Sequence, residues 1–154
     1  MRTIERNIVG GFIFSKDGKL LLGKNRKGGV YQGAWLIPGG GVKNQETLLD
    51  ALQREILEES AIDIRRDALV QPIDGATSGK SEKTLRHSGE RVMVQMQFFN
   101  FKVQLHKNAK DIRVRTEDDF SDARWFNTDE LPKLHLSVPT VTTLQKLGYL
   151  PEHE

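Results

Sequence analysis

The feature that most constrains this chain is a set of spaced acidic residues within positions 40–62. Its last part, residues 54–62, reads REILEESAI. On a helix that turns about 100° per residue, Glu55, Glu58 and Glu59 project within an arc of about 100°. Like charges three and four residues apart repel, and a hard cation such as Mg²⁺, which takes carboxylate oxygens, removes that repulsion. The spacing therefore predicts a helix that holds a divalent metal against a phosphate chain.

A solvated acidic helix face is the alternative interpretation of such a patch. The run contains more than acids, however, because a glycine and an arginine also stand at set distances from them. The six fixed positions are Gly40, Glu46, Arg54, Glu55, Glu58 and Glu59. If each residue type occurs at roughly one position in fifteen, six matches arise by chance on the order of once in ten million windows. The spacing therefore favours the metal site over the solvated face.

This run resembles the Nudix box, the signature of a family that hydrolyses nucleoside diphosphates linked to another group. The family pattern is Gly-x5-Glu-x7-Arg-Glu-U-x-Glu-Glu-x-Gly-U, where U is a bulky aliphatic residue. The chain matches every fixed position except the second glycine, where Ala61 stands. In family members that glycine lies just past the helix, where a positive φ is often needed. Alanine there is expected to cost about 1 kcal/mol and leaves the position of the helix end open.

The resemblance implies roles for the matching residues. Glu55, Glu58 and Glu59, with a backbone carbonyl near Gly40, are the expected metal ligands. Glu55 and Glu58 are also the candidates for the general base that removes a proton from water, and the sequence does not separate a base from a ligand.

Two further parts of the site are expected from the resemblance. Arg54 and Glu46 look like the family's internal pair, in which the arginine orients the catalytic acids, and the alternative for them is an ordinary surface ion pair. Asp119, with Asp118 as second choice, resembles an additional metal ligand, because the spacing from Phe120 to the following tryptophan is similar to that of many members. A solvated acidic loop is the alternative for that segment.

The substrate is the harder question. Three stretches, residues 29–35, 39–42 and 136–144, resemble a bacterial nucleoside triphosphatase branch of the family. That branch cleaves nucleoside or deoxynucleoside triphosphates, often pyrimidine ones, to the monophosphate and pyrophosphate. The residues around the box also resemble GDP-mannose hydrolases, so a nucleotide sugar or another nucleoside-diphosphate compound stays open. A nucleotide-binding sensor without hydrolysis is a third possibility for the same fold.

The candidate substrate contacts lie outside the box. Lys24 and Arg26 are candidates for phosphate binding, with a solvated loop as the alternative. Tyr31 or Phe120 is expected to stack on a base, and core packing is the alternative for either ring. Ser137 resembles a position that reads the edge of the base in nucleotide-cleaning members.

The resemblance also implies a cofactor and a pH dependence. Mg²⁺ is the expected cofactor, with Mn²⁺ as a possible substitute. A bound metal would neutralise the phosphates and lower the pKa of a bound water, and a carboxylate would remove its proton. We therefore expect complete metal dependence and activity that rises toward alkaline pH.

Length and composition set the remaining limits. A chain of 154 residues predicts one domain over positions 1–154, and a formal net charge of +2 gives no footprint for polymeric nucleic acid. There is no cysteine and no apolar stretch long enough to span a membrane, so a cytoplasmic protein is expected. A homodimer, common in the family, is possible.

Periodicity predicts the α/β class. Strands are expected at residues 7–14, 20–23, 35–37, 68–73, 91–105 and 122–126, and helices at about 45–60 and at 138–146. The polar stretch 75–90 is interpreted as a lid over the substrate or a disordered loop. This order of elements implies helices packed on a mixed sheet, and the resemblance implies the Nudix-type α/β/α sandwich.

Overall fold

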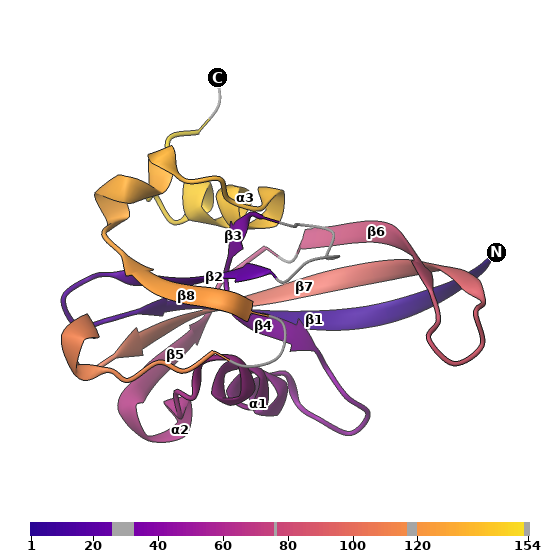
Figure 1. Ribbon diagram of the computed structural model, residues 1–154, viewed down its shortest axis with the longest axis horizontal. Helices are drawn as coiled ribbons and strands as arrows, with labels where there is room; N and C mark the ends of the chain where they lie inside the picture. Colours follow the sequence, from indigo (N-terminus) through magenta and orange to yellow (C-terminus); the bar gives the residue numbers. More distant parts are fainter. Residues whose placement is uncertain (26–32, 76, 117–119, 153–154) are drawn as a thin grey trace.

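A mixed β-sheet forms the middle layer of the molecule (Figure 1). The computed structural model describes residues 1–25, 33–75, 77–116 and 120–152. Its strands are β1 (Arg2–Phe14), β2 (Leu20–Asn25), β3 (Trp35–Leu36), β4 (Gly39–Gly41), β5 (Ala68–Pro72), β6 (Thr77–Thr84), β7 (Arg91–Leu105) and β8 (Phe120–Phe126). The main path runs β3-β2-β1-β7-β5, while β4 pairs with β1, β6 with β7 and β8 with β2.

Helices cover both faces of this sheet (Figure 1). Helices α1 (Leu48–Ser60) and α2 (Ile64–Asp67) lie on one face, and α3 (Val138–Lys146) lies on the other with the 3-10 turn η2 (Thr128–Lys133). A second 3-10 turn, η1, spans Ala109–Asp111. The predicted α/β/α sandwich around a mixed sheet is confirmed.

The central strand β1 shows why the sheet needs two covers. Its second half is buried on both sides, and successive side chains of a strand point to opposite faces. Val9 and Ile13 join the core cluster that contains Leu52 and Ile56 of α1. Phe12 and Phe14 join the cluster that contains Leu144 of α3. Strand β1 pairs in parallel with β7 along its whole length, and every other strand pair is antiparallel within the described chain.

Helix α1 begins three residues later than the sequence predicts. Gln45 has φ = 68°, outside the helical region, and the Thr47 hydroxyl accepts a hydrogen bond from the Asp50 N–H as the N-terminal cap. The other end follows the expectation, because Ala61 takes the left-handed conformation (φ 65°, ψ 18°) and its N–H bonds to the Leu57 carbonyl. An alanine therefore occupies a position that glycine fits with less strain.

The prediction for residues 75–90 is wrong. Instead of a lid or a disordered loop, Thr77–Thr84 forms β6, antiparallel to β7, and the Leu85 N–H bonds to the Glu90 carbonyl in the hairpin turn. The segment reads TSGKSEKT, with no apolar side chain to alternate, and its side chains are exposed or half-buried, so its residues gave no strand signal. Backbone hydrogen bonds to β7 hold it instead.

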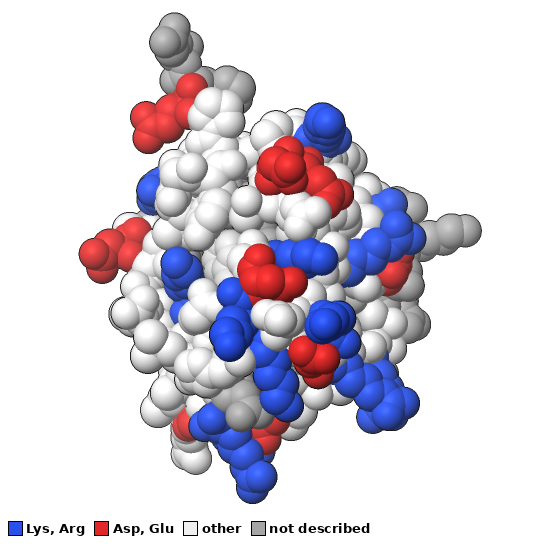
Figure 2. Space-filling model, turned by 90° about the vertical axis from the view of Figure 1, so that its left-hand side faces the viewer, with Lys and Arg blue, Asp and Glu red and all other residues white. Residues whose placement is uncertain are grey.

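Two properties of the surface bear on partners. No helix in the described part of the chain has the length and apolar character needed to cross a membrane. On the face shown in Figure 2, which carries the β1–β2 end of the sheet, acidic side chains lie among the basic ones. That face therefore presents no uniform positive field.

Candidate active site

The carboxylates of α1 meet the glycine strand β4. In the β4–β1 ladder Ile8 pairs with Gly41, Val9 with Gly40 and Gly10 with Gly39. Residue 40 therefore faces the same side as Val9, toward α1. A Cβ on Gly40 would collide with the Glu55 carboxyl group. Glycine at position 40 thus leaves room for the Glu55 carboxyl group against the strand.

Glu59 is the buried acid of the site. Its side chain is 3% exposed, and its Oε1 accepts a hydrogen bond of 2.9 Å from the Gly39 N–H. It also hydrogen-bonds to the Glu55 carboxyl group one helical turn earlier. Two carboxyl groups in contact share either a proton or a cation, because two bare negative charges would repel.

Burial raises the pKa of Glu55 above its usual value. Loss of hydration is the largest cause, and the Arg54 guanidinium opposes it while the negative charge of Glu58 adds to it. The Glu55 carboxyl therefore holds a proton more readily than an exposed glutamate, and a nearby cation would lower its pKa again.

Arg54 and Glu46 form a two-pronged pair. Arg54 Nε donates to Glu46 Oε2 at 2.7 Å, and Nη2 donates to Oε1 at 2.9 Å. The Lys43 N–H also donates to Glu46 Oε1, at 2.8 Å. The hydrogen bonds from Arg54, with that from Lys43, lower the pKa of Glu46 to about 2, and the same pair raises the pKa of Arg54. Both groups are mostly shielded from water, so the interaction is more than an exposed surface pair.

Arg54 also links the other parts of the site. Its Nη2 donates to the Gly41 carbonyl at 2.9 Å, and its Nη1 donates to Glu55 Oε1 at 2.8 Å. Glu58 lies 3.5 Å from the same Nη1 and is the most exposed of the three helical acids. The guanidinium thus fixes β4, the loop before α1 and the helical acids relative to one another.

The described acids fit a hard cation without forming a complete cage. Within the part of the chain that the structure describes, no three His, Cys, Asp or Glu side chains are arranged as a metal site. Glu55 and Glu59 are nevertheless in contact, and burial raises the pKa of Glu55, so the surroundings disfavour an uncompensated carboxylate there. Carboxylate oxygens are the donors that Mg²⁺ takes, usually one or two at a time with waters and substrate phosphates.

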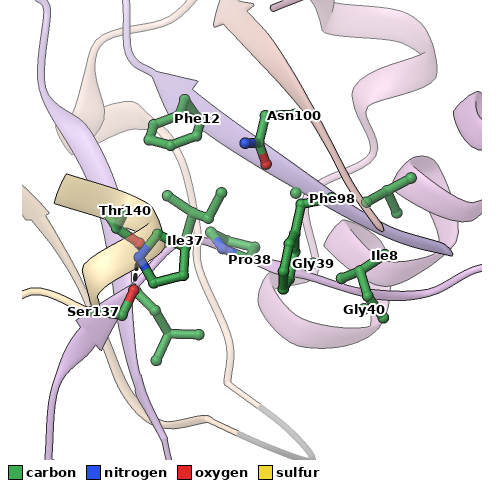
Figure 3. A pocket seen from close by; sticks show the side chains of 14 residues that line it. Ile8, Phe12, Ile37, Pro38, Gly39, Gly40, Phe98, Asn100, Ser137 and Thr140 are labelled. Atoms are coloured by element: carbon green, nitrogen blue, oxygen red, sulfur yellow. Dashed lines mark hydrogen bonds between the residues drawn. The ribbon is translucent and has the colours of Figure 1, made fainter. Parts of the chain in front are cut away.

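An apolar pocket of about 140 Å³ opens on the other face of β4 (Figure 3). Residue 39 pairs with Gly10, so both face α3 rather than α1. Figure 3 shows Ser137 and Thr140 at one end of the pocket and Ile8 and Gly40 at the other. The remaining walls are mainly the side chains of Phe12, Leu36, Ile37, Pro38, Phe98 and Pro139.

Three polar side chains interrupt these apolar walls. The Ser137 and Thr140 hydroxyls share a hydrogen bond of 2.7 Å and are almost fully buried. Asn100 Nδ2 donates to Thr143 Oγ1 at 3.2 Å, from β7 to α3. A mainly apolar cavity with a few fixed polar groups is typical of a small-molecule site.

The predicted substrate contacts have different outcomes. Ser137 lies in the pocket wall. Lys24 lies on β2 with its Nζ 4.8 Å from the centre of the Trp35 ring, so its charge is beside an aromatic face. Arg26, Tyr31 and Asp119 lie outside the described residues, and for Phe120 only the backbone at the start of β8 is described.

Sequence reasoning missed several residues of the pocket, above all Asn100. A signal existed, because Val92, Val94, Met96 and Phe98 alternate along β7 and the next residue on that face is Asn100. A polar residue that interrupts an apolar face is a candidate for ligand binding.

Comparisons with known proteins agree with this geometry. The sequence pattern of the NUDIX domain family matches residues 5–144. The nucleoside triphosphatase NudI of Escherichia coli O139:H28 is 30% identical over 140 residues, which cover 90% of this chain and 94% of that protein.

Two solved structures show the same fold. The dihydroneopterin triphosphate pyrophosphohydrolase of E. coli superposes with a TM-score of 0.70 at 17% identity, covering 91% of this chain and 92% of its own. The Nudix hydrolase RenU of M. smegmatis gives a TM-score of 0.68 at 17% identity, covering 98% of this chain and 91% of its own. At these identities the likeness concerns the fold alone.

Proposed function

Since this chain belongs to the Nudix hydrolase family, which acts on phosphoric anhydride bonds, we propose that it is a magnesium-dependent pyrophosphohydrolase of nucleoside or deoxynucleoside triphosphates. The products would be the monophosphate and pyrophosphate. The observation that carries the proposal is the position of β4, with clustered carboxylates on one face and an apolar pocket on the other. A ligand with an apolar ring and a charged phosphate chain matches both faces. The 30% identity to a nucleoside triphosphatase supports the triphosphate as substrate.

The acids of α1 would hold the metal. Family members generally use a divalent cation, and Glu55, Glu58 and Glu59 with the Gly40 carbonyl supply the oxygen donors that favour Mg²⁺, or Mn²⁺ in its place. Asp119 is proposed as a further ligand. When bound, the ion would neutralise phosphate charge and acidify a bound water.

The residues of the chain would position the acids and move the proton. Arg54, held by Glu46, keeps the Glu55 carboxyl against Gly40. Glu55, with its raised pKa, is suited to accept a proton from the attacking water, and the more exposed Glu58 is the other candidate. Because the base must be ionised, activity should rise with pH.

The apolar pocket would hold the base, with Ser137 reading its edge. Its volume of about 140 Å³ is close to that of an apolar cavity of about 150 Å³ known to bind benzene. The pocket therefore has room for at least a single six-membered ring, as in a pyrimidine nucleotide. We propose that Lys24 and Arg26 contact phosphates and that Tyr31 or Phe120 stacks on the base.

Domain number, oligomeric state and cellular location are part of the same proposal. Residues 1–154 would act as one domain, as a monomer or a homodimer, on small nucleotides in the cytoplasm. Polymeric nucleic acid is not an expected partner.

Product analysis tests the function directly. The purified protein with Mg²⁺ is given a panel of nucleoside triphosphates and nucleotide sugars, beside the variants Glu59→Gln and Glu82→Gln. Glu59→Gln should fold, because the amide oxygen of the introduced glutamine can still accept from the Gly39 N–H, whereas Glu82 is an exposed acid on β6 and serves as the control. We expect release of pyrophosphate and monophosphate, lost in Glu59→Gln and kept in Glu82→Gln.

Other outcomes identify other functions. Turnover of nucleotide sugars alone, giving a sugar phosphate and a monophosphate, would agree with the proposed metal site but overturn the proposed substrate. Binding without turnover of any compound would identify a nucleotide sensor.

A further inference from the structure

Gly41 has a different reason to be glycine from its neighbour Gly40. Its φ is not positive, so the backbone does not require glycine there. A Cβ on Gly41 would collide with Arg6 Nη2 and lie 3.2 Å from Arg6 Cζ. The missing side chain leaves the space that the Arg6 guanidinium occupies.

Arg6 is an exposed residue of β1. It makes no hydrogen bond or ion pair with any other residue that the structure describes. Arg2, by contrast, lies on the same strand and donates to Glu90 at 2.8 Å. The charge of Arg6 is thus available to a ligand.

The strand register places Arg6 beside the pocket. Arg6 precedes Ile8 by two residues on β1, so both side chains point to the face that carries the pocket. Ile8 pairs with Gly41, and Ile8 and Gly40 line the end of the pocket opposite Ser137 (Figure 3). Arg6 therefore lies at the end nearest the glycine strand, where a bound nucleotide would carry its phosphates.

The cation nearest the acids is not available for this purpose. Arg54 already donates to Glu46, Glu55 and the Gly41 carbonyl. A triphosphate at the glycine strand would gain from a positive group beyond the metal ion, Lys24 and Arg26 proposed above. A guanidinium presents parallel N–H donors that match phosphate oxygens.

We propose that Arg6 is a substrate-binding residue that contacts the phosphate chain, and that Gly41 is glycine in order to admit it. This inference rests on the proposed function, because it assumes a nucleotide with its base in the apolar pocket. The contact is made in the ground state and the transition state alike, so it should act on KM rather than on kcat.

A double-mutant cycle tests the inference. Arg6→Ala is expected to raise KM for the best triphosphate about tenfold, with kcat changed less than about twofold. Gly41→Ala should fold, because only the flexible end of Arg6 must move, and it should raise KM to a similar extent. The double variant should be no worse than Arg6→Ala, since the alanine acts only by displacing Arg6.

Two more variants serve as controls. Arg2→Ala removes a cation from the same strand and should keep the KM of the unaltered protein. Arg6→Lys should raise KM less than Arg6→Ala does, because lysine restores the positive charge but lacks the parallel N–H donors of a guanidinium. Equal KM values for Arg6→Ala and the unaltered protein would overturn the proposal, and so would independent, additive effects of Arg6→Ala and Gly41→Ala.

A binding measurement separates this inference from the proposed function. Failure of the unaltered protein to cleave any triphosphate would overturn the function. In that case inorganic tripolyphosphate with Mg²⁺ is titrated by calorimetry, and Arg6→Ala should bind it about tenfold more weakly than Arg2→Ala does. Equal affinity of the two variants, or no binding to the unaltered protein, would overturn the role of Arg6.

Discussion

The Glu55 carboxyl is placed where its own ionisation is unfavourable. Burial raises its pKa although Arg54 donates to it at 2.8 Å. The folded protein therefore binds the Glu55 proton more tightly than the unfolded chain does. The stability linked to this group is fully present below the ordinary pKa of 4.5 and declines as the pH rises through the raised value. Above the raised pKa, the ionised Glu55 carboxyl therefore lowers the stability of the folded protein when no cation is bound.

Replacing Glu55 by glutamine separates stability from activity. In chelator, Glu55→Gln should have a higher midpoint of thermal unfolding than the unaltered protein near pH 8, because the amide cannot ionise. The difference should disappear below about pH 4.5. Turnover with metal should fall by about 10² or more, as expected when a general base or metal ligand is lost. A lower unfolding midpoint for Glu55→Gln at pH 8, with Glu82→Gln unchanged, would show that the Arg54 contact outweighs burial.

Among the elements, helix α1 has a stabilising N-terminal cap and a strained C-terminal residue. Thr47 caps its N-terminus, whereas Ala61 takes a left-handed conformation that alanine adopts at a cost. This conformational strain lies at the residue that follows Glu59 and Ser60, which are buried at the end of the helix. The position of Glu59 therefore depends on a helix end that is conformationally strained at Ala61.

Ala61→Gly should stabilise the protein by up to about 1 kcal/mol, since glycine adopts φ of 65° without a Cβ clash. Chemical denaturation measures the change, and turnover should be unaltered because no side chain of the site is touched. Gly18→Ala makes the matched reverse test, because Gly18 has φ of 81° in open surroundings and should lose stability. No gain for Ala61→Gly would mean that the larger entropy of the unfolded glycine chain cancels the relief of strain.

At the scale of the whole molecule, the candidate site joins two layers that otherwise pack separately. The carboxylates belong to the α1 side of the sheet, and Ser137 and Thr140 belong to the α3 side. Strand β4 and the adjoining part of β1 lie between them. A ligand that occupies both faces should therefore stabilise both layers at once.

Metal and nucleotide should accordingly stabilise the protein together. A non-hydrolysable triphosphate analogue with Mg²⁺, at about 100 times its Kd, should add about 2.7 kcal/mol, which is roughly 5–10 °C for a chain of this size. The analogue in chelator should give a much smaller shift at the same concentration. Equal shifts with and without metal, followed by thermal unfolding, would contradict binding through the carboxylates.

The sequence was most informative where a structure repeats locally. The strand Arg91–Leu105 and the helix Val138–Lys146 have the predicted bounds, because alternation and helical spacing are properties of neighbouring residues. The resemblance of residues 40–62 to the Nudix box likewise implied the pairing of Arg54 with Glu46 that the structure contains.

Only the tertiary structure decided the features that depend on distant partners. The polar strand β6 exists because β7 supplies its hydrogen bonds, and no local pattern reports that. Asn100 enters the pocket, and Arg6 reaches Gly41, through the register of β1 with β7 and β4. By itself, the sequence determined the family, the acids and the main periodic elements. The register decided which face each residue shares, because a shift of one residue would move every side chain to the opposite side of the sheet.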